Sequence, residues 1–362
     1  MNRSVLITII VAIVLIGAGG SYVLLSSGDD EEGKTYDVRV GYLNGDLHQL
    51  ARVVATDEEI NGGESLFSEY GLNISTPNPD GYSVGGDVMS AFDAGDIDIG
   101  FLGAPPAILR SLNVGTDIVI VAKVNSEGSA LVVDEGVTNF TQLKGKTVAS
   151  PGTSSIQHLM LLELAEQNGM NVKLKGTDGD ENTVYFVAML PSLMDAALDT
   201  DQVDAAIGWE PFMSEIILAG DGHALLWSSD VWEDHPCCVI AVSRTFAETN
   251  PDTVKMFLEA FIEANNIIDD AMEQGSGEKY SRIMDLAETF AGVDEDVVLD
   301  SMDHMTLDYH IGDGFEDYLI QFAQSYIDLN AIPASKLSDR GYANVTAYVD
   351  DLVQTQYLEE AE

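Results

Sequence analysis

One stretch of the sequence occurs twice in degenerate form: residues 91–98 read AFDAGDID, and residues 197–204 read ALDTDQVD. Each copy has the small and apolar residues of a helix end, then a polar turn, then the start of a short strand at Ile97 or Val203. Two such units within one chain predict two α/β lobes of related design.

A second pair of similar segments lies upstream of the first pair. Residues 38–42 form a predicted strand that runs into Asn-Gly at 44–45, and residues 147–149 form one that runs into Pro-Gly at 151–152. A predicted helix follows each turn. Alternating strands and helices build a mostly parallel sheet, and such sheets bind ligands beyond the carboxyl ends of their strands. We therefore expect a ligand cleft at these turns.

The rest of the chain agrees with this plan and then changes at Asn250. Strands and helices alternate before it, whereas apolar residues at helical spacing predict helices alone after it. The C-terminal third is therefore expected to pack as helices around one lobe. Strands are predicted at residues 37–42, 73–76, 97–102, 117–122, 130–133, 147–149, 184–187, 203–207 and 239–242, and helices at 47–55, 88–94, 155–168 and 193–198.

The composition describes a folded and strongly acidic protein. The chain has 362 residues, 46% of them hydrophobic, which is enough for two domains of ordinary size. Lys and Arg number 16 against 61 Asp and Glu, a net charge of -45 that makes nucleic acid a poor partner. A uniformly acidic surface repels itself unless salt screens it, so the composition suggests a salty environment.

The charge leads to a prediction about stability. We expect residues 34–362, produced without the N-terminal segment, to be monomeric and to melt at a lower temperature when salt is removed, because the like charges are then less screened. Thermal melts at low and at molar KCl measure this difference. An unchanged midpoint would contradict the prediction.

The N-terminus has the pattern of a membrane anchor. Arg3 precedes an uncharged apolar run at residues 5–25, close to the ~20 residues that a membrane helix needs. Acidic residues follow at 29–32, so the positive-inside bias leaves the N-terminus in the cytoplasm and places the rest outside. The alternative is a cleaved signal peptide, whose apolar region is usually shorter, roughly 7 to 15 residues. We expect residues 1–33 to be a membrane anchor with an acidic tether.

Five segments together carry a resemblance to a known family. They are residues 41–50 (GYLNGDLHQL), 91–100 (AFDAGDIDIG), 103–106 (GAPP), 145–155 (GKTVASPGTSS) and 208–212 (GWEPF). Their order and spacing resemble the nitrate, sulfonate and taurine class of ABC-transporter substrate-binding proteins. The similarity covers roughly residues 36–330.

The resemblance implies a type II periplasmic-binding-protein fold of the α/β class and a role in transport. Such a protein closes two lobes around a small ligand and delivers it to the permease subunits of an ABC importer, without a cofactor. On this chain the resemblance puts one lobe at residues 34–126 and 232–362, and the other at 127–231. We expect a monomer on the extracytoplasmic side of the cell membrane.

The loop at residues 150–155 is the first expected part of the ligand site. It joins a strand to a helix, where hydroxyls and free backbone N–H groups form a site for an anion. Thr153, Ser154 and Ser155 supply three hydroxyls beside a glycine, whereas a structural helix cap needs only one. A cap that does not contact ligand is the alternative.

Polar and aromatic residues in the matching loops are expected to complete the site. A carboxylate beside an aromatic face, as at Trp209 and Glu210, suits an ammonium group, so a zwitterion such as an amino sulfonate fits both halves better than nitrate. The alternatives are a core Trp209, a Glu210 that supports the hinge and an exposed His48. The expected ligand-binding residues are Asn44, Asp46, His48, Gly103, Asn125, Thr153, Ser154, Ser155, Trp209 and Glu210.

Neither a metal site nor a catalytic site is expected. Cys237 and Cys238 are adjacent, which makes a metal clamp or an ordinary long-loop disulfide impossible within one chain, and the apolar residues 239–242 beside them predict buried free thiols. The alternative for the pair is a strained vicinal disulfide. The histidines lack metal-ligand spacing, and no nucleophile elbow, phosphate loop or dinucleotide fingerprint occurs.

Two functions from other classes remain as alternatives to transport. The family also resembles proteins that make or bind a pyrimidine precursor of thiamine, so an enzyme on the same fold is one of them. The other is the ligand-sensing ectodomain of a signalling protein.

Overall fold

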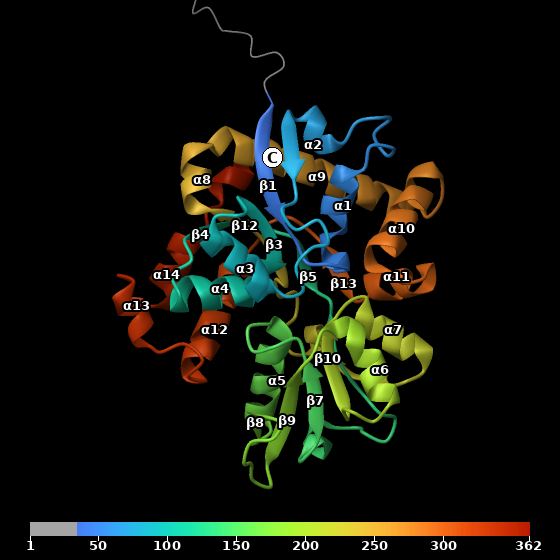
Figure 1. Cartoon of the computed structure of the whole chain (residues 1–362), viewed down its shortest axis with the longest axis vertical. Coiled ribbons are helices and arrows are strands. Elements are labelled where there is room, and N and C mark those ends of the chain that lie inside the picture. Colours follow the sequence, from blue (N-terminus) through green and yellow to red (C-terminus); the bar gives the residue numbers. More distant parts are fainter. Residues whose placement is uncertain (1–34) are drawn as a thin grey trace, which may run out of the picture. The chain divides into compact units, whose positions relative to one another are not determined.

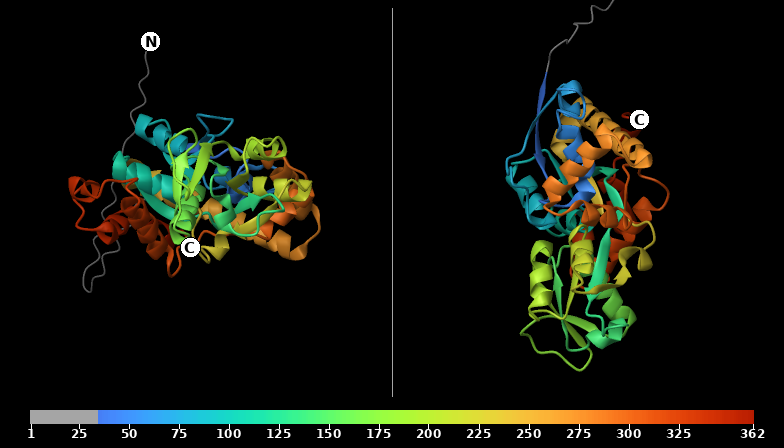
Figure 2. Two further views of the ribbon diagram at one scale, coloured as in Figure 1. Left: turned by 90° about the horizontal axis from the view of Figure 1, so that it is seen from below. Right: turned by 90° about the vertical axis from the view of Figure 1, so that its right-hand side faces the viewer.

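Two β-sheets organise residues 35–362, the part of the chain that this computed structural model describes (Figure 1). The predicted anchor and tether at residues 1–33 lie outside the described residues. Within the described part, no helix combines the length and the apolar character needed to cross a bilayer. Figure 2 shows the two sheets, each with its own helices, after quarter turns of the view.

The first sheet consists of β1 (Tyr36–Gly41), β2 (Leu72–Ser75), β3 (Ile99–Gly103), β4 (Ile118–Lys123) and β12 (Cys238–Ser243). Their order is β2-β1-β3-β12-β4. β1 runs parallel to β2 and β3, and β12 returns antiparallel between β3 and β4. The central strands are apolar and almost wholly buried, as is typical of strands covered on both faces.

Helices from both ends of the sequence cover this sheet. Phe257 and Phe261 on the long α9 pack against Phe101 of β3, and Phe257 also stacks on Phe67 of α2. The helical segments are η1 (Leu47–Gln49), α1 (Leu50–Thr56), α2 (Leu66–Glu69), α3 (Gly85–Ala94), α4 (Ala104–Asn113), α8 (Arg244–Thr249), α9 (Pro251–Gln274), α10 (Glu278–Ala291), α11 (Glu295–Met302), α12 (Phe315–Asp328), α13 (Ser335–Asp339), α14 (Val345–Leu352) and α15 (Gln356–Glu359).

The second sheet consists of β6 (Ser129–Val133), β7 (Thr147–Ser150), β8 (Asn171–Leu174), β9 (Thr183–Ala188), β10 (Ala205–Trp209) and β11 (His223–Trp227). Their order is β11-β6-β10-β7-β9-β8, and only β6 runs antiparallel to its neighbours. The accompanying helices are η2 (Phe140–Leu143), α5 (Ile156–Gln167), η3 (Pro191–Leu193), α6 (Met194–Asp199), α7 (Phe212–Ala219) and η4 (Ser228–Asp230). The prediction of two mostly parallel sheets is confirmed.

The repeated stretch leads into a central strand of each sheet, β3 in the first copy and β10 in the second. Asp98 accepts a hydrogen bond from the backbone N–H of Arg39 at 2.9 Å, and Asp204 accepts one from that of Thr147 at 2.8 Å. A basic side chain also pairs with each aspartate at 2.6 Å, Arg39 with Asp98 and Lys146 with Asp204. The repeat therefore fixes the register of the neighbouring parallel strand in both sheets.

Three chain segments lie side by side where the chain passes between the sheets. β5 (Asn125–Glu127) leads from the first sheet to the second, and residues 235–237 lead back. The N–H of Glu127 donates to the carbonyl of His235, and the N–H of Cys237 donates to that of Asn125. On its other side β5 pairs with β13 (Met305–Leu307). The prediction of helices alone after Asn250 is therefore wrong at β13, because β5 offers it a pairing edge.

Candidate functional site

A small cavity is lined by residues from both sheets, where β1 and β3 of the first sheet and β7 and β10 of the second end. The space inside it that the centre of a water molecule can reach has a volume of about 30 Å³. Three helices begin at its wall: α3 after Val84, α4 after Gly103 and α5 after Ser155. The N-termini of α3 and α5 present backbone N–H groups and the positive end of a helix dipole, which favours an anionic occupant. The N-terminus of α4 adds only its dipole, because Pro105 and Pro106 lack an N–H and the N–H of Ala104 donates to the carbonyl of Cys237.

The structure brings six of the ten predicted residues to this cavity. They are Asp46, His48, Gly103, Ser154, Ser155 and Trp209. The other four, Asn44, Asn125, Thr153 and Glu210, are not part of its lining. Asn44 and Thr153 are exposed on the loops beside it, and Asn125 and Glu210 are buried behind it.

The two serines of the 150–155 loop have different surroundings. The Ser155 hydroxyl caps α5, because it accepts a hydrogen bond from the N–H of His158 at 3.1 Å and donates to the carbonyl of Gly152. Within residues 35–362, no hydrogen bond is made by the Ser154 hydroxyl. A Cβ on Gly86 would lie 3.4 Å from this hydroxyl oxygen, so Ser154 reaches the start of α3, which accompanies the first sheet. Ser154 is therefore available to a ligand.

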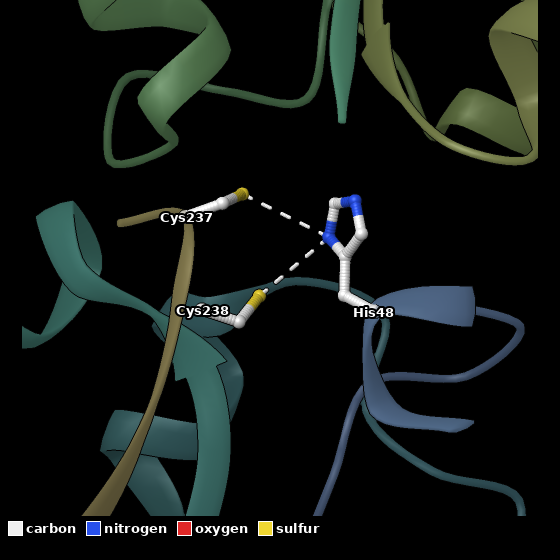
Figure 3. Close-up of side chains that lie close together, drawn as sticks. All are labelled: His48, Cys237 and Cys238. Atoms are coloured by element: carbon white, nitrogen blue, oxygen red, sulfur yellow. Dashed lines mark hydrogen bonds between the residues drawn. The ribbon is translucent and has the colours of Figure 1, made fainter. Parts of the chain in front are cut away.

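His48 is buried in the wall of the cavity, so the alternative of an exposed His48 is wrong. Asp46 caps the short η1 helix by accepting from the N–H of His48 and from the side-chain amide of Gln49. Its carboxylate lies 3.1 Å from Nδ1 of His48. The same nitrogen lies 3.8 Å from the sulfur of Cys237 and 3.8 Å from that of Cys238 (Figure 3).

These neighbours change the protonation of the wall. Burial alone would lower the pKa of His48, but the Asp46 carboxylate and the Cys237 sulfur outweigh it and raise the pKa to about 9. The hydrogen bond from Cys238, aided by His48 and opposed by burial, lowers the pKa of the Cys237 thiol to about 6. At neutral pH the arrangement favours a His48 imidazolium beside a Cys237 thiolate.

Trp209 and Glu210 point to different places. Trp209 lines the cavity, whereas the Glu210 side chain is buried and accepts hydrogen bonds from the N–H of Ser214 at 3.1 Å and from the hydroxyl of Ser301 at 3.2 Å. Ser301 belongs to α11, so Glu210 joins the second lobe to the C-terminal helices. Burial, opposed by these hydrogen bonds, raises the pKa of Glu210 to about 7.

Asn125 is buried in the crossing strand β5. Its side-chain amide donates to the carbonyls of Ser126 and Glu127, and its oxygen accepts from the N–H of Cys238 at 3.0 Å. The side chain thereby holds the backbone of Cys238 beneath the cavity. Its prediction as a ligand contact stays a prediction, as do those for the other nine residues.

Several lining residues were not predicted. Gly85 was missed although a Gly-Gly pair ahead of a helix is a recognisable signal for close approach of a ligand to the backbone. Cys237 and Cys238 were predicted as buried free thiols, which they are, but they also face the cavity. The remaining unpredicted residues are Leu43, Val84, Pro106, Pro151, Ile156 and Gln157.

Comparisons of the sequence show similarity to binding proteins. The NMT1-like family model matches residues 32–279. The taurine-binding periplasmic protein of Escherichia coli (strain K12) is 29% identical over 186 residues, which are 51% of this chain and 54% of that protein. The nitrate/nitrite binding protein NrtA of Nostoc sp. is 22% identical over 259 residues, 68% of this chain and 57% of that protein. The chain thus spans little more than half the length of these curated relatives.

Comparisons of structure show the fold. The periplasmic aliphatic sulphonate binding protein SsuA from Escherichia coli matches with a TM-score of 0.65 and 22% identity, over 85% of this chain and 92% of that one. The desulfurization enzyme DSZB matches with a TM-score of 0.58 and 13% identity, over 90% of this chain and 98% of that one. The predicted periplasmic-binding-protein fold is confirmed, and both binding proteins and an enzyme share it.

Proposed function

The chain belongs to the NMT1-like family, and from this premise we propose that it is an extracytoplasmic solute-binding protein of an ABC importer. Its ligand in this proposal is a small anionic or zwitterionic molecule such as a sulfonate, taurine or nitrate. The names of its relatives support this class, since they bind taurine, nitrate and aliphatic sulfonates.

The observation that carries the proposal is the meeting of three helix N-termini at one cavity between the lobes. Within residues 35–362, no lysine or arginine lines this cavity. An anionic group would therefore be held by the backbone N–H groups of α3 and α5, by the helix dipoles and by the Ser154 hydroxyl. His48 lines the same cavity, and its raised pKa of about 9 adds a positive charge to the wall.

The proposal includes a closing motion. In it, one lobe comprises residues 34–126 and 232–362, and the other comprises residues 127–231. The segments that pass between the sheets would serve as the hinge, so that ligand enters when the lobes part and is enclosed when they close. The apolar run at residues 5–25 would anchor a monomer to the cell membrane, beside the permease subunits that receive the ligand.

Replacing Ser154 tests where the ligand lies. We expect Ser154→Ala to lower ligand affinity roughly 10- to 100-fold, because a hydrogen bond to a charged group contributes about 1.5 to 3 kcal/mol. The unfolding midpoint without ligand should stay the same, since Ser155, not Ser154, caps α5. Calorimetric titration with taurine, an alkyl sulfonate and nitrate measures the affinities.

The exposed Thr153 provides the matched control in the same loop. Thr153→Ala should change affinity less than Ser154→Ala does. Equal affinity of the wild type and Ser154→Ala for the ligand that binds would show that the site lies elsewhere. If none of the three ligands binds the wild type, the ligand class of the proposal is wrong.

A zwitterionic ligand also needs an anionic partner for its ammonium group. The Asp46 carboxylate lines the cavity and could face an ammonium group, while the helix N-termini face the acidic group. Asp46→Asn should then weaken binding of taurine more than binding of an alkyl sulfonate. The sequence-based proposal that Glu210 binds the ammonium group predicts the same contrast for Glu210→Gln. Comparison of the two variants therefore shows which carboxylate contacts the ammonium group.

An enzyme on the same fold is the second candidate. The Cys237 sulfur lies 3.8 Å from Nδ1 of His48 at the cavity wall, and a thiol beside an imidazole is the usual arrangement of a cysteine nucleophile. Incubation of the purified protein with the same ligands, followed by mass spectrometry, separates the two functions. Recovery of unchanged ligand supports the binding protein, and a new product supports the enzyme.

A further inference from the structure

We propose that His48, Cys237 and Cys238 bind one Zn²⁺ ion in the wall of the cavity, with one coordination position open toward the ligand. One ligand atom from each residue lies within 4.8 Å of the others, and all three side chains are buried. Figure 3 shows both sulfur atoms directed at the same imidazole nitrogen. The proposal departs from the expectation from the sequence that adjacent cysteines exclude a metal clamp.

The spacing of the three atoms fits zinc. Tetrahedral zinc with Zn–S bonds of about 2.3 Å and Zn–N bonds of about 2.0 Å requires N···S separations of about 3.5 Å and an S···S separation of about 3.8 Å. Both N···S separations in the structure are 3.8 Å. A shift of a few tenths of an ångström, within the reach of side-chain rotation, would bring both N···S separations to the tetrahedral value.

The fold explains how adjacent cysteines can face the same point. In a strand, neighbouring side chains point to opposite faces. Cys238 is the first residue of β12, however, and Cys237 belongs to the segment before it. Asn125 holds both residues, since its backbone carbonyl accepts from the N–H of Cys237 and its side chain from that of Cys238. Because these hydrogen bonds hold the backbone, both cysteines are in place before a metal ion binds.

All three ligands come from the first lobe. β12 runs antiparallel to β3, so its first residue lies at the edge where β1 and β3 end and where the η1 helix carries His48. The site is therefore complete before the lobes close. Metal can load whether or not a ligand is bound.

The donor set favours zinc over other ions. Two thiolates and an imidazole are soft and borderline donors, which suit Zn²⁺ and Cu⁺, whereas Mg²⁺ and Ca²⁺ prefer oxygen. Asp46 has an oxygen 3.7 Å from the Cys238 sulfur, and a nearby carboxylate suits Zn²⁺ better than Cu⁺. On binding, the thiol protons leave to the solvent, because thiolates are the ligands.

The fourth position distinguishes this site from a purely structural one. Structural zinc usually has four protein ligands, whereas zinc that contacts a ligand or substrate has three and an open position. His48, Cys237 and Cys238 all line the cavity that the three helices face. An oxygen of an anionic ligand would complete the coordination; this last step rests on the proposed function, while the metal site does not.

Titration with Co²⁺ followed by displacement with Zn²⁺ tests the site. The protein, reduced with a phosphine, should bind one Co²⁺ with a thiolate charge-transfer band and the visible bands of tetrahedral cobalt, and Zn²⁺ should remove both. Cys237→Ser and Cys238→Ser should each weaken Zn²⁺ binding more than about 100-fold, since each removes one of three protein ligands. The exposed His310→Gln is the matched control and should bind as the wild type does.

The conditions must exclude weak binding to the acidic surface. Molar KCl with excess Mg²⁺ saturates carboxylates but not thiolates. Wild-type affinity in the Cys237→Ser/Cys238→Ser double variant, with an unchanged unfolding midpoint of the metal-free protein, would overturn the site. So would the absence of a bound Co²⁺ or Zn²⁺ in the reduced wild type, or binding of Cu⁺ alone.

Ligand titrations of the metal-free and zinc-loaded protein keep the two proposals apart. If zinc binds in a thiolate site and no anion or zwitterion binds either form, the proposed function fails and the metal site stands. If ligands bind the metal-free protein and zinc does not bind, the metal site fails and the proposed function stands.

Discussion

Replacing Gly128 by alanine is expected to lower the free energy of unfolding by about 2 to 5 kcal/mol. Gly128 follows the crossing strand β5 with φ at +83°, a left-handed conformation that costs other residues roughly 1 to 2 kcal/mol. An added Cβ would also lie 2.2 Å from Nε2 of His48 and 3.0 Å from the Cβ of Met305. Overpacking of this kind typically costs a further 1 to 3 kcal/mol. Urea unfolding at constant KCl measures the loss.

Gly136→Ala provides the matched control. Gly136 is exposed, has no positive φ, and an added Cβ there would meet nothing within 4 Å. Its substitution should change stability by no more than about 0.5 kcal/mol. If the two variants were equally stable, Gly128 would pack less tightly against His48 and Met305 than the structure shows.

Glu210→Gln is expected to make stability depend less on pH. The folded-state pKa of about 7 is above the usual value of 4.5 because of burial, so the folded protein keeps the Glu210 proton where the unfolded chain loses it. This carboxyl therefore lowers stability progressively as pH rises from about 4.5 to 7, by roughly 3 kcal/mol in total. Glutamine cannot lose a proton, so the variant should gain that amount relative to the wild type across this range.

Urea unfolding of both proteins at several pH values measures the gain. The exposed Glu166→Gln is the control for removal of one surface charge, and its gain should be a few tenths of a kcal/mol at most. If the free energies of unfolding of Glu210→Gln and the wild type changed with pH in the same way, Glu210 would be exposed to solvent.

The elements that the sequence predicted best are those with a strong local pattern. The repeated stretch predicted β3 and β10 because each strand is an apolar run that follows a polar turn. β11 and β13 were missed for different reasons. β11 reads HALLW, which has no clear alternation, and β13 has three residues whose only strand signal is their partner β5. Pairing with a distant segment requires no recognisable sequence pattern in the shorter strand.

The residues of the candidate site were likewise predictable only where a local sequence pattern indicates them. Ser154 and His48 were predicted to face the cleft because both lie on turns that follow parallel strands, and the ends of such strands meet at one edge. The approach of Cys237 to His48 could not be predicted, since 189 residues separate them and only the antiparallel return of β12 brings them together. The hydrogen bond between Glu210 and Ser301 of α11 has no sequence signal either.

The pairing of β13 with β5 has a mechanical consequence. A single extended segment twists easily, because a few backbone torsions absorb the rotation, whereas three laterally bonded segments must deform together. In the proposed closing motion the junction would therefore resist bending more strongly than a single strand does. β13 follows α11, whose Ser301 hydrogen-bonds Glu210, so bending at the junction would also displace the C-terminal helices. If the chain binds its ligand as proposed, the stiffness of this junction would set how quickly the bound molecule is released.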